Sequence, residues 1–104
     1  MVKPFQQPWA ALLLALSSTL CHGGDAAAGK QKAAACAGCH GMAGVATAPS
    51  YPNLAGQKEA YLVKAIQAYR KGVRADPIMG AMVASLSDND VEDLAAYFAG
   101  LPRR

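Results

Sequence analysis

The chain has 104 residues, a formal net charge of +3 and 53% hydrophobic residues. This length suffices for one domain, and so weak a positive charge gives no electrostatic basis for binding nucleic acid. Only roughly 80 residues remain once an N-terminal leader is set aside, which is near the size at which a hydrophobic core alone becomes marginal. We therefore expect a single small domain that needs a further source of stability.

The N-terminal segment, residues 1–23, has the features of a secretory signal peptide. A single cation, Lys3, is followed by an apolar run over residues 9–20 that is short for a membrane span. Small residues gather near Gly23, as they do at cleavage sites. We predict a signal peptide at residues 1–23 and a folded domain at residues 24–104; an uncleaved membrane anchor is the alternative.

A helix is predicted from Ala26 to Ala35, directly after the leader. Asp25 is a suitable N-cap, and the alanine-rich run contains no helix breaker except Gly29. Glycine lowers helix stability, so Gly29 indicates either tolerated flexibility or the close approach of another helix.

The most informative motif follows, Cys36-Ala37-Gly38-Cys39-His40, a Cys-x-x-Cys-His pattern typical of covalent haem attachment. Two thiols three residues apart lie on one side of a helical turn, so both can reach one edge of a porphyrin and form thioether bonds. The adjacent His40 is then held beneath the iron, where a neutral imidazole nitrogen is a suitable axial ligand. We predict one covalently bound haem c, held by Cys36 and Cys39 and ligated by His40.

Two other interpretations of this motif are weaker. A thioredoxin-like dithiol needs a strand-helix-strand pattern, whereas the flanks here are alanine-rich and helical. A structural zinc site needs four ligands, but the remaining cysteine and histidine, Cys21 and His22, lie in the predicted leader.

A bound haem also offers a large apolar face that supplements a small core.

Residues 41–57 are rich in Gly, Ala, Pro and Thr and have no helical period, which predicts a loop that wraps one side of the ring. The Pro52 carbonyl is a candidate acceptor for the second imidazole nitrogen of His40. The alternative is that Pro49 and Pro52 only stiffen the loop.

Apolar residues then recur at helical spacing and predict an amphipathic helix from Lys58 to Lys71, ended by Gly72. They are Tyr61, Leu62, Ala65, Ile66 and Tyr69. Arg70, Lys71 and Arg74 are candidates to pair with a haem propionate, and the sequence does not choose among them.

The segment 74–85 contains the candidate second iron ligands, Met79 and Met82. A thioether is a soft, neutral ligand that favours ferrous iron and raises the reduction potential. Met42 is too close to His40 along the chain to reach the opposite face of the ring. Spacing does not choose between Met79 and Met82, and either could instead be a flexible core residue.

A last helix is predicted to start at Ser87, a suitable N-cap, and to stop at Gly100 and Pro102. Its first turns hold three acidic residues, which the helix dipole favours, and an apolar stripe follows. The acidic residues are Asp88, Asp90 and Glu92, and the stripe is Val91, Leu94, Ala95 and Phe98. No strand pattern of useful length occurs in the sequence, so the predicted fold class is all-α.

These motifs together resemble a class I c-type cytochrome, similar to the small bacterial monohaem cytochromes of the cytochrome c-553 kind. The resemblance covers the chain after the leader. The residues that carry it are Gly24–Lys30, Cys36–His40, Tyr51–Gln57, Tyr69–Gly72, and Leu86–Asp88 followed by Asp90. It implies three to five helices wrapped around one haem c, with the first and last helices packed together.

The resemblance also implies roles for single residues. In the family the axial methionine stands seven residues before the leucine of the Leu-Ser-Asp element, which corresponds to Met79 here. The proline of the Pro-Asn-Leu element implies Pro52 as the partner of His40, and Leu54 is expected to pack on the haem.

The function implied is one-electron transfer in the periplasm, where c-type haem is attached. The donor would be a quinol-oxidising complex or a dehydrogenase, and the acceptor a terminal oxidase or reductase. With both axial positions filled by His40 and Met79, an enzyme is not expected. We expect a monomer that meets membranes only through its partners, with an apolar docking patch at Gly41, Met42, Ala43 and Val45. The alternatives are a dedicated haem subunit of a dehydrogenase complex, and a haem peroxidase or gas sensor with an open sixth site.

Overall fold

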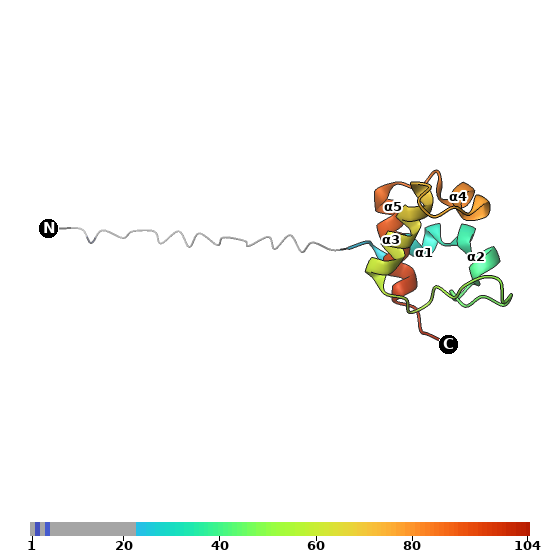
Figure 1. The fold of residues 1–104 in the computed structure, drawn as a ribbon. Helices are drawn as coiled ribbons and strands as arrows, with labels where there is room; N and C mark the ends of the chain where they lie inside the picture. The colour runs from blue at the N-terminus through green and yellow to red at the C-terminus, as the bar shows by residue number, and fades with distance from the viewer. Residues whose placement is uncertain (1, 3, 5–22) are drawn as a thin grey trace.

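The computed structural model describes residues 2, 4 and 23–104. The predicted signal peptide, residues 1–23, lies almost entirely outside the described residues and stays a prediction. The described part of the chain forms five helices and no strand (Figure 1). They are α1 (Ala26–Lys32), α2 (Ala34–His40), α3 (Glu59–Arg70), α4 (Pro77–Val83) and α5 (Asp88–Ala99). The predicted all-α class, with three to five helices, is therefore confirmed.

The predicted first helix is divided into α1 and α2, which differs from the continuous helix expected from Ala26 to Ala35. The division falls at Ala33, a buried residue that has ψ of −12°. Cys36 N donates to the Ala33 carbonyl at 2.9 Å, a tighter i to i+3 bond in place of the usual α-helical one. The helix that carries the cysteines therefore starts anew immediately after α1.

The first and last helices pack closely, as the family resemblance implied. Gly29 in α1 is buried against α5, and a Cβ atom there would overlap the Asp93 carbonyl and lie 2.8 Å from Tyr97 Cβ. Of the two explanations for Gly29, the close approach of another helix is therefore correct. A side chain at this position would push α1 away from α5.

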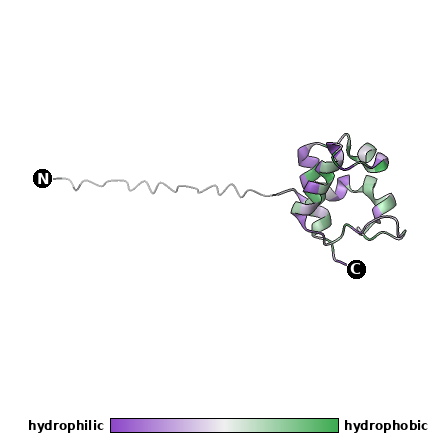
Figure 2. Cartoon of the chain, viewed as in Figure 1, coloured by the Kyte–Doolittle hydropathy of each residue, from purple (hydrophilic) through white to green (hydrophobic). Residues whose placement is uncertain are grey.

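The core lies where α1 and α3 pack on α5, and Figure 2 shows apolar turns of α3 and α5 at the centre of the domain. The buried apolar side chains of α5 form the predicted stripe. They are Val91, Leu94, Ala95 and Phe98, joined by Leu62 of α3 and by Ala33. Burying a Leu or Phe side chain contributes about 1.5–3 kcal/mol, so a core this small gives only modest stability. Cys36 and Leu54 pack at its edge.

The ends of the longer helices agree with the sequence. Ser87 caps α5 in a capping box with Asp90, and Lys58 and Lys71 flank α3 as its cap residues. Gly72 follows with φ of +70°. At 12 residues, α3 and α5 are about 18 Å long, and none of the helices of the described chain is long and apolar enough to cross a bilayer.

Candidate haem site

Helix α2 presents the three residues of the attachment motif. Cys36 and Cys39 are half-buried free thiols one turn apart, and His40 is the last residue of the helix. Burial raises the pKa of the Cys36 thiol, which keeps it protonated. Because the two cysteines are one helical turn apart, their side chains lie on the same side of α2, as attachment to one edge of a porphyrin requires.

His40 is buried, with 7% of its surface exposed, and its Nδ1 lies 2.8 Å from the carbonyl oxygen of Pro52. Because a carbonyl only accepts hydrogen bonds, Nδ1 carries the proton and donates it. In the neutral imidazole, the other ring nitrogen, Nε2, then has the lone pair that a metal needs. The Pro52 carbonyl therefore accepts the hydrogen bond from His40 for which it was a candidate, and Pro52 does more than stiffen the loop.

The loop after α2 folds back so that Pro52 meets His40. The carbonyl of Gly44 accepts from the backbone N–H groups of Leu54 (2.8 Å) and Ala55 (3.0 Å). The Asn53 side chain accepts from Ala46 N at 2.8 Å. Sequence reasoning did not assign Asn53 this role, although an asparagine next to a proline is a usual turn residue.

The start of this loop requires glycine. Gly41 has φ of +88°, and a Cβ atom there would overlap the Val45 carbonyl. The sharp turn after His40 is therefore possible only at a residue without a side chain, and it returns the chain toward the α2 helix.

Helix α4 carries both candidate methionines. Its N-cap, Asp76, accepts from Ile78 N at 2.9 Å and Met79 N at 3.0 Å. Met79 is half-buried, whereas Met82 is 45% exposed. Figure 1 shows α2 and α4 on the same side of the domain, away from the buried α3–α5 contact. The choice of Met79 over Met82 stays a prediction.

Of the three cations proposed to pair with a haem propionate, Arg70 already forms an ion pair with Asp88. Arg70 donates to Asp88 Oδ1 at 2.7 Å and to Gln67 Oε1 at 2.9 Å. The Arg74 guanidinium lies 4.8 Å from the centre of the Tyr69 ring. Lys71 and Arg74 remain as candidates.

The residues present fit a covalently attached haem. Two free thiols suit the thioether bonds to a porphyrin edge, and an imidazole nitrogen with a thioether on α4 suits the iron of a c-type haem. Large apolar side chains of α4 and of the loop at Tyr51 are also exposed, as expected where a ring would cover them. They are Ile78 at 60%, Met82 at 45% and Tyr51 at 37%.

Comparison with known proteins shows the family to which the chain belongs. Residues 26–102 match the family model for cytochrome c. The chain is 50% identical over 90 residues to cytochrome c4 of Pseudomonas aeruginosa, covering 85% of this chain and 45% of the relative. It is 48% identical over 79 residues to cytochrome c-554(548) of Halomonas halodenitrificans, covering 73% of this chain and 95% of the relative. A thiosulfate dehydrogenase electron acceptor of Stutzerimonas stutzeri is 40% identical over 72 residues, covering 66% of this chain and 33% of that protein.

The solved structures give the same fold. The crystal structure of reduced recombinant cytochrome c4 from Pseudomonas stutzeri superposes with a TM-score of 0.73 at 43% identity, covering 76% of this chain and 46% of the other. The chain therefore spans about half the length of the cytochrome c4 relatives that it matches. Its helices have the class I cytochrome c arrangement implied by the sequence motifs. The chain belongs to the cytochrome c family, and its cofactor is covalently bound haem c.

Proposed function

We propose that the protein is a periplasmic one-electron carrier, whose haem is attached through Cys36 and Cys39 and ligated by His40 and Met79. The haem iron supplies the one-electron couple when bound. The protein's own contribution is to orient the ligands, exclude water and present a surface to redox partners.

The observation that carries the proposal is the 2.8 Å hydrogen bond from His40 Nδ1 to the Pro52 carbonyl. This bond fixes the tautomer and the plane of the imidazole, and it raises the basicity of Nε2. Because His40 is also buried, competing water is kept from the ring. The chain thus holds one strong nitrogen ligand in a single orientation.

The second ligand would be Met79 on α4. A neutral thioether would stabilise the ferrous state of a bound haem iron. Because His40 and Met79 would leave no place for a substrate at the metal, the protein would act as a carrier rather than an enzyme. Leu54, half-buried at the edge of the core, supplies apolar packing on the haem.

The docking surface is the uncharged segment that directly follows His40. Gly41, Met42, Ala43 and Val45 carry no charge, and Met42 is 86% exposed. A small apolar patch suits brief contacts with redox partners. The donor is a quinol-oxidising complex or a dehydrogenase and the acceptor a terminal oxidase or reductase, and the carrier moves between them as a monomer.

A visible and far-red spectrum of the purified oxidised protein, with carbon monoxide added after reduction, tests the proposal. A far-red sulfur-to-iron band and no response to carbon monoxide are expected from a closed histidine–methionine pair. A high-spin spectrum that shifts with carbon monoxide would instead favour a peroxidase or gas sensor.

A second candidate is a dedicated haem subunit of a dehydrogenase complex. The 40% identity to a thiosulfate dehydrogenase electron acceptor favours it. This subunit would use the same site residues and differ only in its partner. Gel filtration of the native periplasmic extract separates the two: a free carrier elutes at the mass of one chain, whereas a subunit elutes with its dehydrogenase at constant ratio.

A further inference from the structure

Helix α5 is the common support for the two helices that carry the proposed iron ligands. Helix α1 packs on α5 and leads into α2, which ends at His40. Helix α3 also packs on α5, and α4, which carries Met79, packs on α3. We call α1 with α2 the histidine arm and α3 with α4 the methionine arm. The relative position of the two ligands therefore depends on how each arm is fixed to α5.

The histidine arm is weakly supported at the junction between α1 and α2. Among the helices of the described chain, α2 has few packing contacts, and these are mainly with α1. A single residue, Ala33, separates the two helices, and α2 has only seven residues, too few to be stable alone. His40 at the far end of α2 is about 10 Å from Ala33, so a tilt of about 10° there moves it by about 2 Å. Ligand geometry tolerates only about 0.5 Å.

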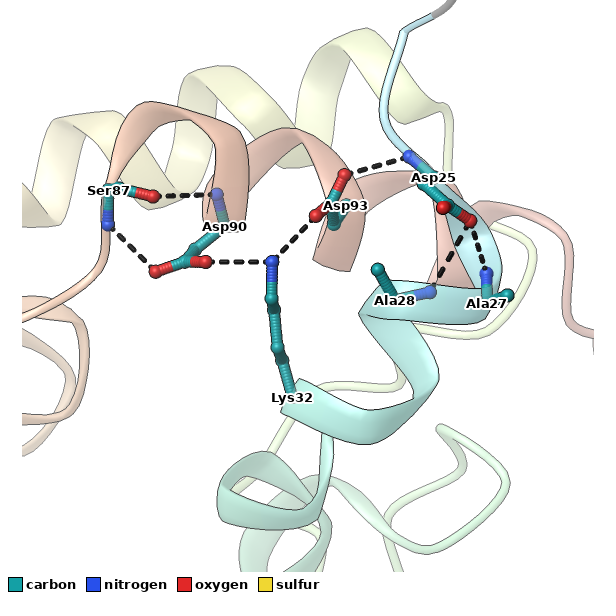
Figure 3. Close-up of polar contacts among 7 residues, drawn as sticks. All are labelled: Asp25, Ala27, Ala28, Lys32, Ser87, Asp90 and Asp93. Carbon is teal, nitrogen blue, oxygen red and sulfur yellow. Dashed lines mark hydrogen bonds and ion pairs between the residues drawn. The ribbon is translucent and has the colours of Figure 1, made fainter.

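Lys32, the last residue of α1, lies beside this junction and contacts two carboxylates of α5 (Figure 3). Its Nζ is 2.7 Å from Asp90 Oδ1 and 2.6 Å from Asp93 Oδ2. The side chains of Lys32, Asp90 and Asp93 are only 33%, 29% and 15% exposed. Partial burial weakens screening by solvent, so these contacts are firmer than most surface ion pairs.

The same carboxylates are themselves held in place. Asp93 Oδ1 accepts from Asp25 N, the N-cap of α1, at 2.8 Å, so one aspartate binds both ends of α1. Asp90 Oδ2 accepts from Ser87 N at 3.0 Å in the capping box of α5. Figure 3 shows Lys32 reaching across from α1 to both carboxylates. The contact is therefore built from oriented groups on both helices.

From this arrangement we infer that Lys32 is a positioning residue for the proximal ligand: its bridge to Asp90 and Asp93 sets the angle at Ala33 and so the place of His40 relative to Met79. The inference rests on the proposed ligation by His40 and Met79. Lys32 touches neither ligand and acts only through the junction with α2. Loss of the bridge would weaken ligation of a bound haem iron by Met79, because His40 would no longer be held at the right distance from α4.

The test uses the full holoprotein and the variant Lys32→Met, which keeps the length of the side chain and removes its charge. Lys30→Met is the matched control, since Lys30 lies in the same turn of α1 and is exposed, with no ion pair in the described part of the structure. Lys32→Arg is the rescue, because a guanidinium can also bridge two carboxylates. The readouts are the pH at which the far-red band disappears and the hydrogen exchange of the amides in α2.

We expect the far-red band of Lys32→Met to disappear at a pH about one unit closer to neutral than in the wild type. The amides of α2 should exchange about tenfold faster, because two partly buried ion pairs are lost. Lys30→Met and Lys32→Arg should follow the wild type. Lys32→Met could instead lower the melting temperature while the pH at which the far-red band disappears and the exchange rates of the α2 amides keep their wild-type values. Lys32 would then be purely structural, and the inference would be wrong.

Two further outcomes are separable. If the wild-type protein lacks the far-red band, the proposed ligation itself fails, whatever the variants show. If Lys32→Met does not accumulate as holoprotein, Asp90→Asn is measured instead, because it removes one partner and leaves the 2.6 Å pair with Asp93. A smaller change in the same direction supports the inference, and wild-type values for band and exchange refute it.

Discussion

At the scale of single residues, Met79 and Met82 are chemically identical and lie one turn apart on α4. Their surroundings differ, since Met79 is half-buried and Met82 is 45% exposed. The partly buried position suits a side chain that is held in place, whereas the exposed one suits a side chain on the rim of the site.

Replacing Met79 by alanine should therefore open the sixth position, while Met82→Ala should leave it closed. For Met79→Ala we expect loss of the far-red band, binding of carbon monoxide after reduction, and a fall in reduction potential of the order of 0.1 V, within the roughly 0.8 V that axial ligands span. Spectroscopy and a redox titration of both variants check this. The reverse pattern would assign Met82 as the ligand.

Residue-scale prediction from sequence is strongest where the chemistry is local. The two thiols and the imidazole are neighbours in the chain, so their shared function follows from spacing alone. The Pro52 contact was only one of two possibilities, because it joins residues 12 apart whose meeting depends on the loop between them. The commitment of Arg70 to Asp88, 18 residues away, had no signal in the sequence.

At the scale of elements, α1 and α5 form the most extensive helix–helix contact in the described part of the chain. Gly29 lies at its centre, and a methyl group there would meet the Asp93 backbone and the Tyr97 side chain. The two helices therefore approach this closely only because α1 has no side chain at position 29.

Gly29→Ala should for this reason destabilise the holoprotein, although alanine is the better helix former. We expect a loss of about 1–3 kcal/mol from overpacking. Gly100→Ala is the control, because a Cβ there would lie an ordinary 3.5 Å from the Ala96 carbonyl and should change stability by less than about 0.5 kcal/mol. Chemical denaturation of the two variants measures the difference. Equal stabilities would show that α1 can shift on α5 without cost.

At the scale of the whole molecule, the bridge between α1 and α5 makes stability depend on pH. The Lys32 ammonium and the Ser87 backbone N–H lower the pKa of Asp90 to about 2. The Lys32 ammonium and the Asp25 backbone N–H also hold the pKa of Asp93 below its usual range. The two carboxylates raise the pKa of Lys32 in turn.

A carboxylate with a lowered pKa in the folded state stabilises above its unfolded pKa of about 3.9 and loses this contribution as the pH falls toward the folded pKa. A lysine with a raised pKa stabilises below its unfolded pKa of about 10.4 and loses this contribution above it. We therefore expect the gap in melting temperature between wild type and Lys32→Met to be largest from about pH 5 to 9 and to close toward pH 2. Melting curves of both proteins over this range measure it, and a gap independent of pH would contradict the ion-pair account.

The sequence by itself determined the covalent chemistry, the all-α class and most helix ends. Each of these features depends on residues within one or two helical turns of each other. Examples are the attachment motif at Cys36–His40 and the N-caps at Asp25 and Ser87. Only the tertiary structure decided the division at Ala33, the purpose of Gly29 and the bridge from Lys32 to Asp93. Lys32 and Asp93 are 61 residues apart, and such contacts exist only once α1 and α5 have packed together, so no local pattern can encode them.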